Sequence, residues 1–246
     1  MALISSAPTS AFIALPDKIT KELEMKRSID KSAQAFTELM YNEFSESIIL
    51  ARLFFTIPFV NLPDENKGFV MNLAKSAEIT DLINDQTLVL SLMGTSGVKL
   101  EWNDRKKSKG HVGIPMASND FIQEIPMMSR LLKQIGVDLS WIEKGDSHIV
   151  SNTFGKIGGV FYVEDAKTEV DTRGRKIIAA QDFVEAEGVK TVFGIGGGYI
   201  GGAAFAVTII FLREVIKKEI AEKFLYSIIR FKTNTNGLMN KGKLFS

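Results

Sequence analysis

The pattern of apolar and polar residues changes its spacing most clearly near the C-terminal end of the chain. Two runs rich in β-branched and aromatic residues, Val189–Ile195 and Ala203–Leu212, flank a glycine-rich connection. Such residues favour strands, and glycine readily adopts the positive φ that a reversing chain needs. The pattern therefore predicts a β-hairpin. Residues 213–231 then show helical spacing, with apolar residues on one face and mostly charged residues on the other.

Two other interpretations of this stretch stay open. Gly196 to Gly201 has the G-x-G-x-x-G spacing of a dinucleotide-binding turn, so the protein would be a flavin- or nicotinamide-binding oxidoreductase that uses the glycine run at 194–202. That turn requires a helix directly after it, whereas residues 206–211 are β-branched and aromatic. Residues 191–212 carry no charge and are long enough to span a membrane, but glycines crowd their first half, so we expect no membrane span.

Helical spacing also marks residues 17–44, where apolar residues form one face between lysines and glutamates. Residues 1–16 lack a basic segment ahead of their apolar part, which argues against a signal peptide and predicts a flexible arm. Residues 233–246 are polar and predict a flexible tail. We therefore expect one domain, residues 17–232, between two flexible ends.

Short apolar runs bounded by Gly, Pro, Asn or Asp predict the remaining strands, and longer periodic segments predict the remaining helices. Gly94–Gly97 is expected to be a turn, and Pro126 to kink or delay a helix. The order of elements predicts an α+β fold, with a central, mainly antiparallel sheet and flanking N- and C-terminal helices. The strands are expected within 45–61, 88–93, 98–102, 111–115 and 160–163, and the helices at 64–77, 119–136 and 180–186.

Composition narrows the possible functions. The net charge of +1 creates no global field that would recruit nucleic acid or anionic lipid. The chain has no cysteine, which excludes disulfides, thiolate catalysis and cysteine-ligated zinc. The same absence fits a reducing compartment, and we expect a cytoplasmic protein.

Three strings resemble the GAF-like domains of the GAF/PAS sensor superfamily, of the kind found ahead of bacterial histidine kinases and nucleotide or diguanylate cyclases. They are LMGTSGVKLEWNDRKKSKGHVGIPM (92–116), IIAAQDFVEAEGVKTVFGIGG (177–197) and AAFAVTIIFLREVIKKEIAEKF (203–224). The resemblance covers about residues 35–232. It implies a cup in which the sheet is the floor, loops are the lid, and the last strand of a hairpin leads into a C-terminal helix.

The resemblance also implies a function. It suggests a non-enzymatic sensory, ligand-binding or protein-interaction module of bacterial signal transduction, which passes a signal through its terminal helices to a separate effector such as a kinase or cyclase. GAF-like domains share no universal ligand motif, so no binding residue carries over from the family. The apolar faces of residues 17–44 and 213–231 would pair across a two-fold axis, and we expect a homodimer. A dimerising adaptor that binds no ligand is a third possibility.

Candidate ligand-binding residues lie on two segments that are expected to be neighbouring loops or strand ends. If both segments roof one cavity, aromatic residues would supply apolar walls, and Arg105 or His111 would bind an anionic group. The structural alternative is that Trp102 is a core aromatic and that the nearby charges form a solvated hairpin tip. The candidates are Trp102, Arg105, His111, Phe161, Tyr162 and Glu164.

The sequence contains no recognisable catalytic set, and it leaves the cofactor unknown. A haem would need His111 or His148 as its axial ligand. Asp146 and His148 are too few for a metal site, which usually needs three or four convergent ligands. The basic run at 104–109 lacks the interleaved aromatic residues of a nucleic-acid platform, so we expect no nucleic-acid partner.

Overall fold

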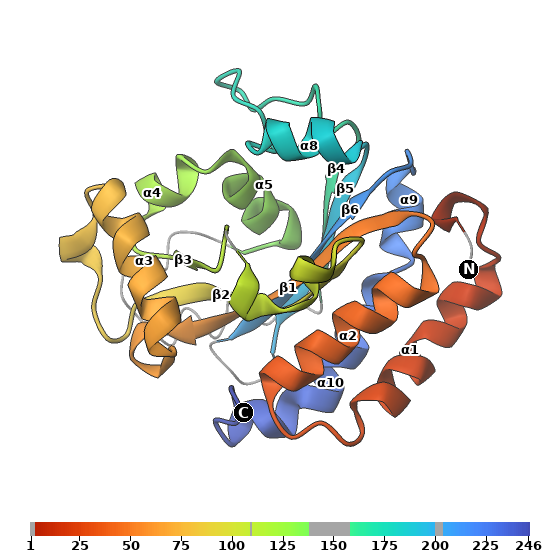
Figure 1. Cartoon of the computed structure of the whole chain (residues 1–246), viewed down its shortest axis with the longest axis horizontal. Coiled ribbons are helices and arrows are strands. Elements are labelled where there is room, and N and C mark those ends of the chain that lie inside the picture. The colour runs from red at the N-terminus through yellow and green to blue at the C-terminus, as the bar shows by residue number, and fades with distance from the viewer. Residues whose placement is uncertain (1–2, 109, 138–157, 200–203) are drawn as a thin grey trace.

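One β-sheet organises the structure. The computed structural model describes residues 3–108, 110–137, 158–199 and 204–246. Within these ranges the sheet has six strands in the order β3-β2-β1-β6-β5-β4, and every neighbouring pair is antiparallel (Figure 1). The predicted α+β fold with a central antiparallel sheet is therefore confirmed. The strands are β1 (Ile48–Pro58), β2 (Leu88–Gly97), β3 (Gly113–Pro115), β4 (Gly159–Val163), β5 (Val192–Gly198) and β6 (Phe205–Leu212).

Helices cover both faces of the sheet (Figure 1). We call the side of α1, α2 and α10 the helical face, and the side of α4, α5 and α8 the cavity face. α3 packs beside the edge strand β3, and α9 packs beside β4 and β5. The helices are α1 (Thr9–Leu23), α2 (Ile29–Glu43), α3 (Asp64–Ser76), α4 (Asn119–Gln123), α5 (Pro126–Ile135), α8 (Gln181–Glu187), α9 (Lys218–Glu222) and α10 (Leu225–Asn240).

Side chains along the central strands alternate between the two faces. In β1, Leu50, Arg52 and Phe54 point to the cavity face, whereas Leu53 and Phe55 join the core under the helical face. Because helices cover both faces, every residue of β6 is buried. A strand that is buried on both sides has no polar face, which is why these runs are almost continuously apolar in the sequence.

β5 and β6 form the predicted hairpin. They pair along their length, from Val192 opposite Phe211 to Gly198 opposite Phe205. The glycine run belongs to β5 as far as Gly198, and the connecting residues 200–203 lie outside the described residues. A strand follows the glycines, so the dinucleotide interpretation lacks the helix that it requires. Among the described residues, no helix is both long enough and apolar enough to cross a bilayer.

Glycines in β4 and β5 let α5 lie close to the sheet. A Cβ atom on Gly159 would lie 2.5 Å from Ile135 Cα, and one on Gly194 would lie 2.8 Å from Ile209 Cδ1. Both distances are shorter than Cβ atoms tolerate in packed interiors, so a side chain there would push α5 or its neighbours outward. Gly159 therefore lets α5, which forms one wall of the cavity described below, lie close to β4, whereas Gly194 leaves room for the side chain of Ile209 in β6.

The N-terminal prediction is wrong in two respects. The segment expected to be one helix over 17–44 consists of two helices, α1 and α2, and α1 begins inside the segment expected to be a flexible arm. Ile4 is fully buried, and its N–H donates to Ser47 Oγ at 2.8 Å and to Glu214 Oε1 at 2.9 Å. These contacts hold the first residues against the start of β1 and the segment after β6. The apolar face of α1 also begins earlier in the chain than was expected, since Phe12 and Leu15 are buried.

The C-terminal prediction is wrong in the same way. The expected helix at 213–231 is divided into α9 and α10, and α10 extends through half of the expected flexible tail. Thr235 is buried, and its hydroxyl shares a 2.7 Å hydrogen bond with the Tyr199 hydroxyl. The residues after α10 are also held in place, since the N–H of Ile29 donates to the carbonyl of Lys243 at 2.8 Å.

Between the two ends, most predicted elements are confirmed, and one region is not. β2 continues through Gly94–Gly97, where a turn was expected, and the expected strand at 98–102 is a short 3-10 helix over Leu100–Asn103. A Cβ atom on Gly94 would lie 2.3 Å from the backbone of Ala33 in α2, so this glycine allows a helix to cross the strand closely. The single helix expected at 119–136 is divided into α4 and α5, and the predicted interruption at Pro126 is confirmed, because Pro126 is the first residue of α5.

Candidate functional site

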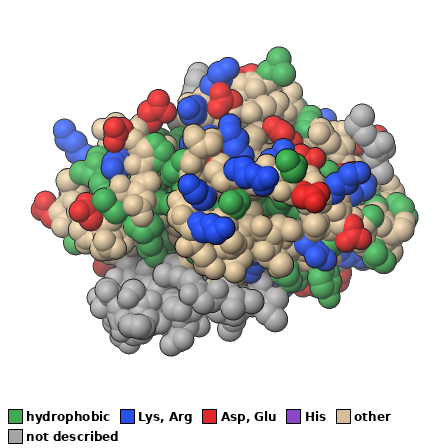
Figure 2. All heavy atoms as spheres, turned by 90° about the horizontal axis from the view of Figure 1, so that it is seen from below, with side chains coloured by type: hydrophobic (Ala, Val, Ile, Leu, Met, Phe, Trp, Pro, Cys, Tyr) green, Lys and Arg blue, Asp and Glu red, His purple; other side chains and the backbone are tan. Residues whose placement is uncertain are grey.

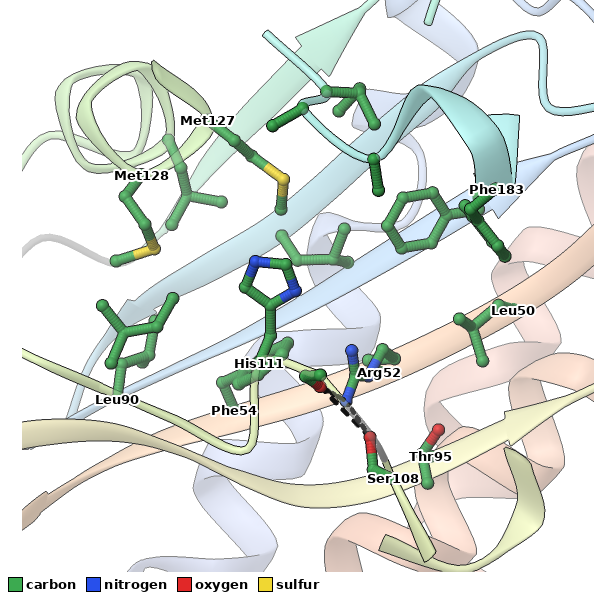
Figure 3. A pocket seen from close by; sticks show the side chains of 18 of the residues that line it. Leu50, Arg52, Phe54, Leu90, Thr95, Ser108, His111, Met127, Met128 and Phe183 are labelled. Atoms are coloured by element: carbon green, nitrogen blue, oxygen red, sulfur yellow. Dashed lines mark hydrogen bonds between the residues drawn. The ribbon is translucent and has the colours of Figure 1, made fainter. Parts of the chain in front are cut away.

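A cavity of about 730 Å³ opens on the cavity face (Figure 3). Side chains of β1, β2 and β6 form its floor, and α5 and the segment that leads into α8 form two walls. The roof comes from residues 98–108 and 110–112, which we call the roof segment. Most of the lining is aliphatic, aromatic or thioether in character. The floor residues include Leu50, Arg52, Phe54, Leu90, Val207 and Ile209.

Aromatic rings close one end of the cavity. Trp102 of the roof segment meets Phe183 of α8 edge to face, with ring centroids 5.7 Å apart. Phe183 in turn meets Phe211 of β6 at 5.3 Å. The ammonium of Lys99 lies 4.9 Å from the centre of a Trp102 ring and covers it from outside. This contact chain joins roof, wall and floor into one rigid apolar end.

Arg52 places a positive charge in the floor. Its Nη2 atom donates to Ser108 Oγ at 2.6 Å and to the carbonyl of Gly110 at 2.8 Å, so the side chain supports the roof segment from below (Figure 3). The guanidinium carbon also lies 5.4 Å from the centre of the Phe54 ring. Burial lowers the pKa of Arg52 to about 10, which leaves the group charged at neutral pH.

His111 extends from the roof segment into the cavity, where Figure 3 shows its ring between Arg52 and the methionines Met127 and Met128. Its backbone has a φ of 51°, which is uncommon for a residue with a side chain. The surrounding protein and the positive charge of Arg52 lower the pKa of His111, although its side chain stays accessible. The imidazole is therefore neutral at neutral pH and can both donate and accept a hydrogen bond.

The structure brings together only part of the loop set that the sequence suggested. Trp102 and His111 line the cavity, as described above. Arg105 instead points out of it: its Nη2 lies 3.4 Å from Asp30 Oδ2, and its guanidinium carbon lies 5.0 Å from the centre of the Phe245 ring. Arg105 therefore connects the roof segment with the start of α2 and with the C-terminal residues.

The three candidates on or beside β4 do not line the cavity. Phe161 is fully buried in the core of the cavity face. Tyr162 points to the other face, and its hydroxyl donates to the carbonyl of Ile216 at 2.6 Å. Glu164 lies beyond the end of the strand and is exposed, and its carbonyl accepts a hydrogen bond from Thr191 Oγ1 at 3.0 Å. The sheet order separates β4 from the roof segment, because β4 and β3 are opposite edge strands.

Arg52 was missed by the sequence analysis, although the sequence carries a signal for it. It is the only charged residue in β1, a strand that is otherwise almost entirely apolar. Arginine is rarely found in a buried strand unless it has a partner or a task, so such a residue is a candidate for function. The sequence could not show which face of the strand it occupies.

The described residues provide few groups for chemistry at the cavity. No three metal-ligating side chains converge within the described part of the chain. Glu101 and Lys107 lie at the cavity but are exposed, and they carry opposite charges. Of the two histidines weighed as haem ligands, His111 lies in the cavity and His148 lies outside the described residues. Nonpolar walls with Arg52 and His111 at one place suit binding of an amphipathic molecule.

No protein-family model and no curated protein matches the sequence. One similar solved structure is the free methionine-R-sulfoxide reductase from Neisseria meningitidis in complex with its substrate, with a TM-score of 0.48, 10% identity and 98% of each chain covered. Another is the GAF domain from a phosphoenolpyruvate-protein phosphotransferase of Coxiella burnetii, with a TM-score of 0.47, 11% identity, and 97% of this chain and 100% of that chain covered. We draw no inference about the activity of this chain from either.

The architecture itself has the features that the sequence resemblance implied. The sheet is the floor of a cup, a loop segment is its roof, and the last strand of the hairpin leads toward the C-terminal helices. These features belong to the predicted α+β arrangement, in which helices flank a central antiparallel sheet.

Proposed function

We propose that this protein is a non-enzymatic ligand-binding module that takes a small, largely apolar molecule into the cavity. The observation that carries the proposal is the cavity itself. Its volume of about 730 Å³ falls within the usual range for ligand pockets, and its lining combines apolar walls with few polar groups. An adaptor that needed no ligand would be expected to fill such a space with side chains, because empty apolar volume destabilises a fold.

A second part of the proposal concerns the signal. The roof segment touches both ends of the chain, since Arg105 contacts Asp30 at the start of α2 and Phe245 near the C-terminus. A ligand under the roof would change the contacts of this segment and thereby the packing of the terminal residues. We propose that a separate effector, such as a kinase or cyclase, reads that change.

The expected homodimer stays a prediction. The apolar faces that suggested it pack within the chain, where Phe44 meets Phe224 at 5.4 Å and Phe36 of α2 meets Phe231 of α10 at 5.3 Å. A dimer formed through these helices would therefore use their exposed sides, where Ile13 of α1 and Tyr226 of α10 lie. The face shown in Figure 2 carries lysines and arginines as well as acidic side chains, with hydrophobic side chains between them.

A neutral fluorescent probe tests the ligand-binding proposal. N-phenyl-1-naphthylamine is apolar, uncharged and bright only in an apolar site. We expect saturable binding with a Kd of about the micromolar range, and a loss of about tenfold in Met127→Trp, which places a larger side chain in the cavity. Met25→Trp is the matched control, because Met25 is 72% exposed and lies away from the cavity. Equal affinities in the two variants, or no saturable binding at all, would remove the cavity from consideration as a binding site.

A further inference from the structure

We propose that the ligand carries an anionic group, a carboxylate or a phosphate, and that Arg52 binds this group in the cavity floor. The inference rests on the proposed function, since it names the class of ligand that the same cavity would take. It also predicts that Arg52 makes the cavity bind anionic molecules more tightly than neutral molecules of similar shape.

The hydrogen bonds of Arg52 leave donors free for such a group. A guanidinium carries five N–H donors. Only Nη2 is used, and it donates to Ser108 Oγ and to the carbonyl of Gly110. Nε and Nη1 have no hydrogen-bond partner among the described residues, and neither atom is sealed from solvent. These donors are open to the cavity, and in Figure 3 one nitrogen of Arg52 faces away from Ser108.

No carboxylate among the described residues compensates the charge of Arg52. Arg130 has a carboxylate oxygen of Glu169 at 2.5 Å, and Arg175 has one of Asp171 at 2.9 Å. Arg52 forms no such salt bridge within the described part of the chain, although burial of its side chain lowers its pKa. A desolvated cation without a counterion destabilises a protein, and an anionic ligand would supply that counterion.

The other polar groups at the cavity agree with this assignment. Glu101 and Lys107 are exposed at the cavity edge and balance each other in charge. His111 lies beside Arg52 and can donate a hydrogen bond to the same anion. The apolar remainder, with Met127, Met128 and the aromatic end at Trp102, would hold the rest of the ligand.

The competing explanation is that Arg52 only supports the roof segment. The two roles use different atoms, because Nη2 holds the roof while Nε and Nη1 make no hydrogen bond within the described part of the chain. Ser108→Ala removes one roof contact and leaves the guanidinium in place. Arg52→Met removes the charge and keeps an unbranched side chain of similar length. Comparing these variants therefore separates support of the roof from binding of an anion.

The experiment compares two probes that share one ring system. 1-Anilinonaphthalene-8-sulfonate carries a sulfonate, and N-phenyl-1-naphthylamine does not. We expect Arg52→Met to weaken binding of the sulfonate probe about tenfold or more and to change binding of the neutral probe by less than about twofold. Lys107→Met makes the same change in net charge, but at the cavity edge, and should weaken binding of the sulfonate probe by less than about threefold. Ser108→Ala should leave the ratio of the two affinities as it is in the wild type.

The outcomes are distinguishable. If the neutral probe fails to bind the wild type, the proposed function fails and the anion site with it. If the neutral probe binds but Arg52→Met weakens both probes equally, Arg52 only supports the roof, and the anion assignment alone is overturned. Circular dichroism confirms that each variant is folded. If Arg52→Met does not fold, Arg52→Lys replaces it in the comparison, and because this variant keeps the charge it should retain part of the wild-type affinity for the sulfonate probe.

Displacement of the sulfonate probe by octanoate or by octyl phosphate, but not by octanol, would support the assignment and identify the preferred anion. Equal displacement by octanol would count against it.

Discussion

The two faces of the sheet are built from the same strands, yet only one of them is filled. On the helical face, the rings of Phe12, Phe44 and Phe224 meet one another with centroids 5.2 to 5.8 Å apart. On the cavity face, methionines, a roof segment and a single arginine enclose about 730 Å³. The same alternation of side chains supplies both faces. The difference indicates that the helical face contributes more to stability; under the proposed function, the cavity face gives up some stability for binding.

The largest expected effect comes from truncating one side chain on each face. Phe224→Ala should lower the free energy of unfolding by about 3–5 kcal/mol, because Phe224 is fully buried among other phenylalanines. Met127→Ala should cost about 1 kcal/mol or less, since this side chain already borders open space. Urea unfolding measures both values. Similar losses at the two sites would mean that the faces do not differ in packing.

A smaller effect is expected from adding one methyl group. A Cβ atom on Gly94 would lie 2.3 Å from the backbone of Ala33, so Gly94→Ala should lower the stability by about 1–3 kcal/mol. Gly68 lies in α3, where an added Cβ atom would meet no other group within 4 Å, and Gly68→Ala should raise the stability by about 0.5–1 kcal/mol. Thermal melts of the two variants give the comparison. A neutral Gly94→Ala would show that α2 can move away from the sheet.

The smallest expected effect is a pH dependence on the cavity face. The pKa of His111 is lowered by burial and by Arg52, and a bound anion would raise it again. Protonation of His111 and binding of an anion therefore favour each other, so the sulfonate probe should bind about threefold more tightly as the pH falls from about 7.5 to about 5.5. The other charged groups at the cavity are Arg52, Glu101 and Lys107. His111→Gln should remove the dependence, and a dependence that persists would assign it to another group.

The sequence predicts the parts of the fold that depend on local chemistry. The hairpin follows from two strand-like runs around glycines, and the end of α8 follows from Gly188, which adopts the left-handed conformation expected of a helix C-cap. The boundaries of α1 and α2 could not be predicted in this way. The six-residue step from Leu23 to Ile29 departs from helical spacing and indicates a break, but no glycine or proline lies between them to locate it. Pro16 lies inside α1, whereas a proline usually marks the end of a helix.

The candidate site could be predicted only in part, because it depends on how distant segments meet. Trp102 and His111 were among the predicted candidates because an aromatic residue and a histidine lie on or beside a predicted loop, and both line the cavity. Arg105 belongs to the same loop, but its partners Asp30 and Phe245 come from opposite ends of the chain, and they draw it out of the cavity. In the sequence, Arg52 can be recognised as the single charged residue of an otherwise apolar strand. Only the pairing of β1 with β2 and β6 places it in the cavity floor.

A crystal structure with the sulfonate probe bound tests the central claim most directly. The account predicts ring density between the sheet and α5, with the sulfonate within hydrogen-bonding distance of the Arg52 guanidinium. It also predicts no density between the helices of the helical face. A probe bound only at the outer surface, with the cavity empty, would contradict the account.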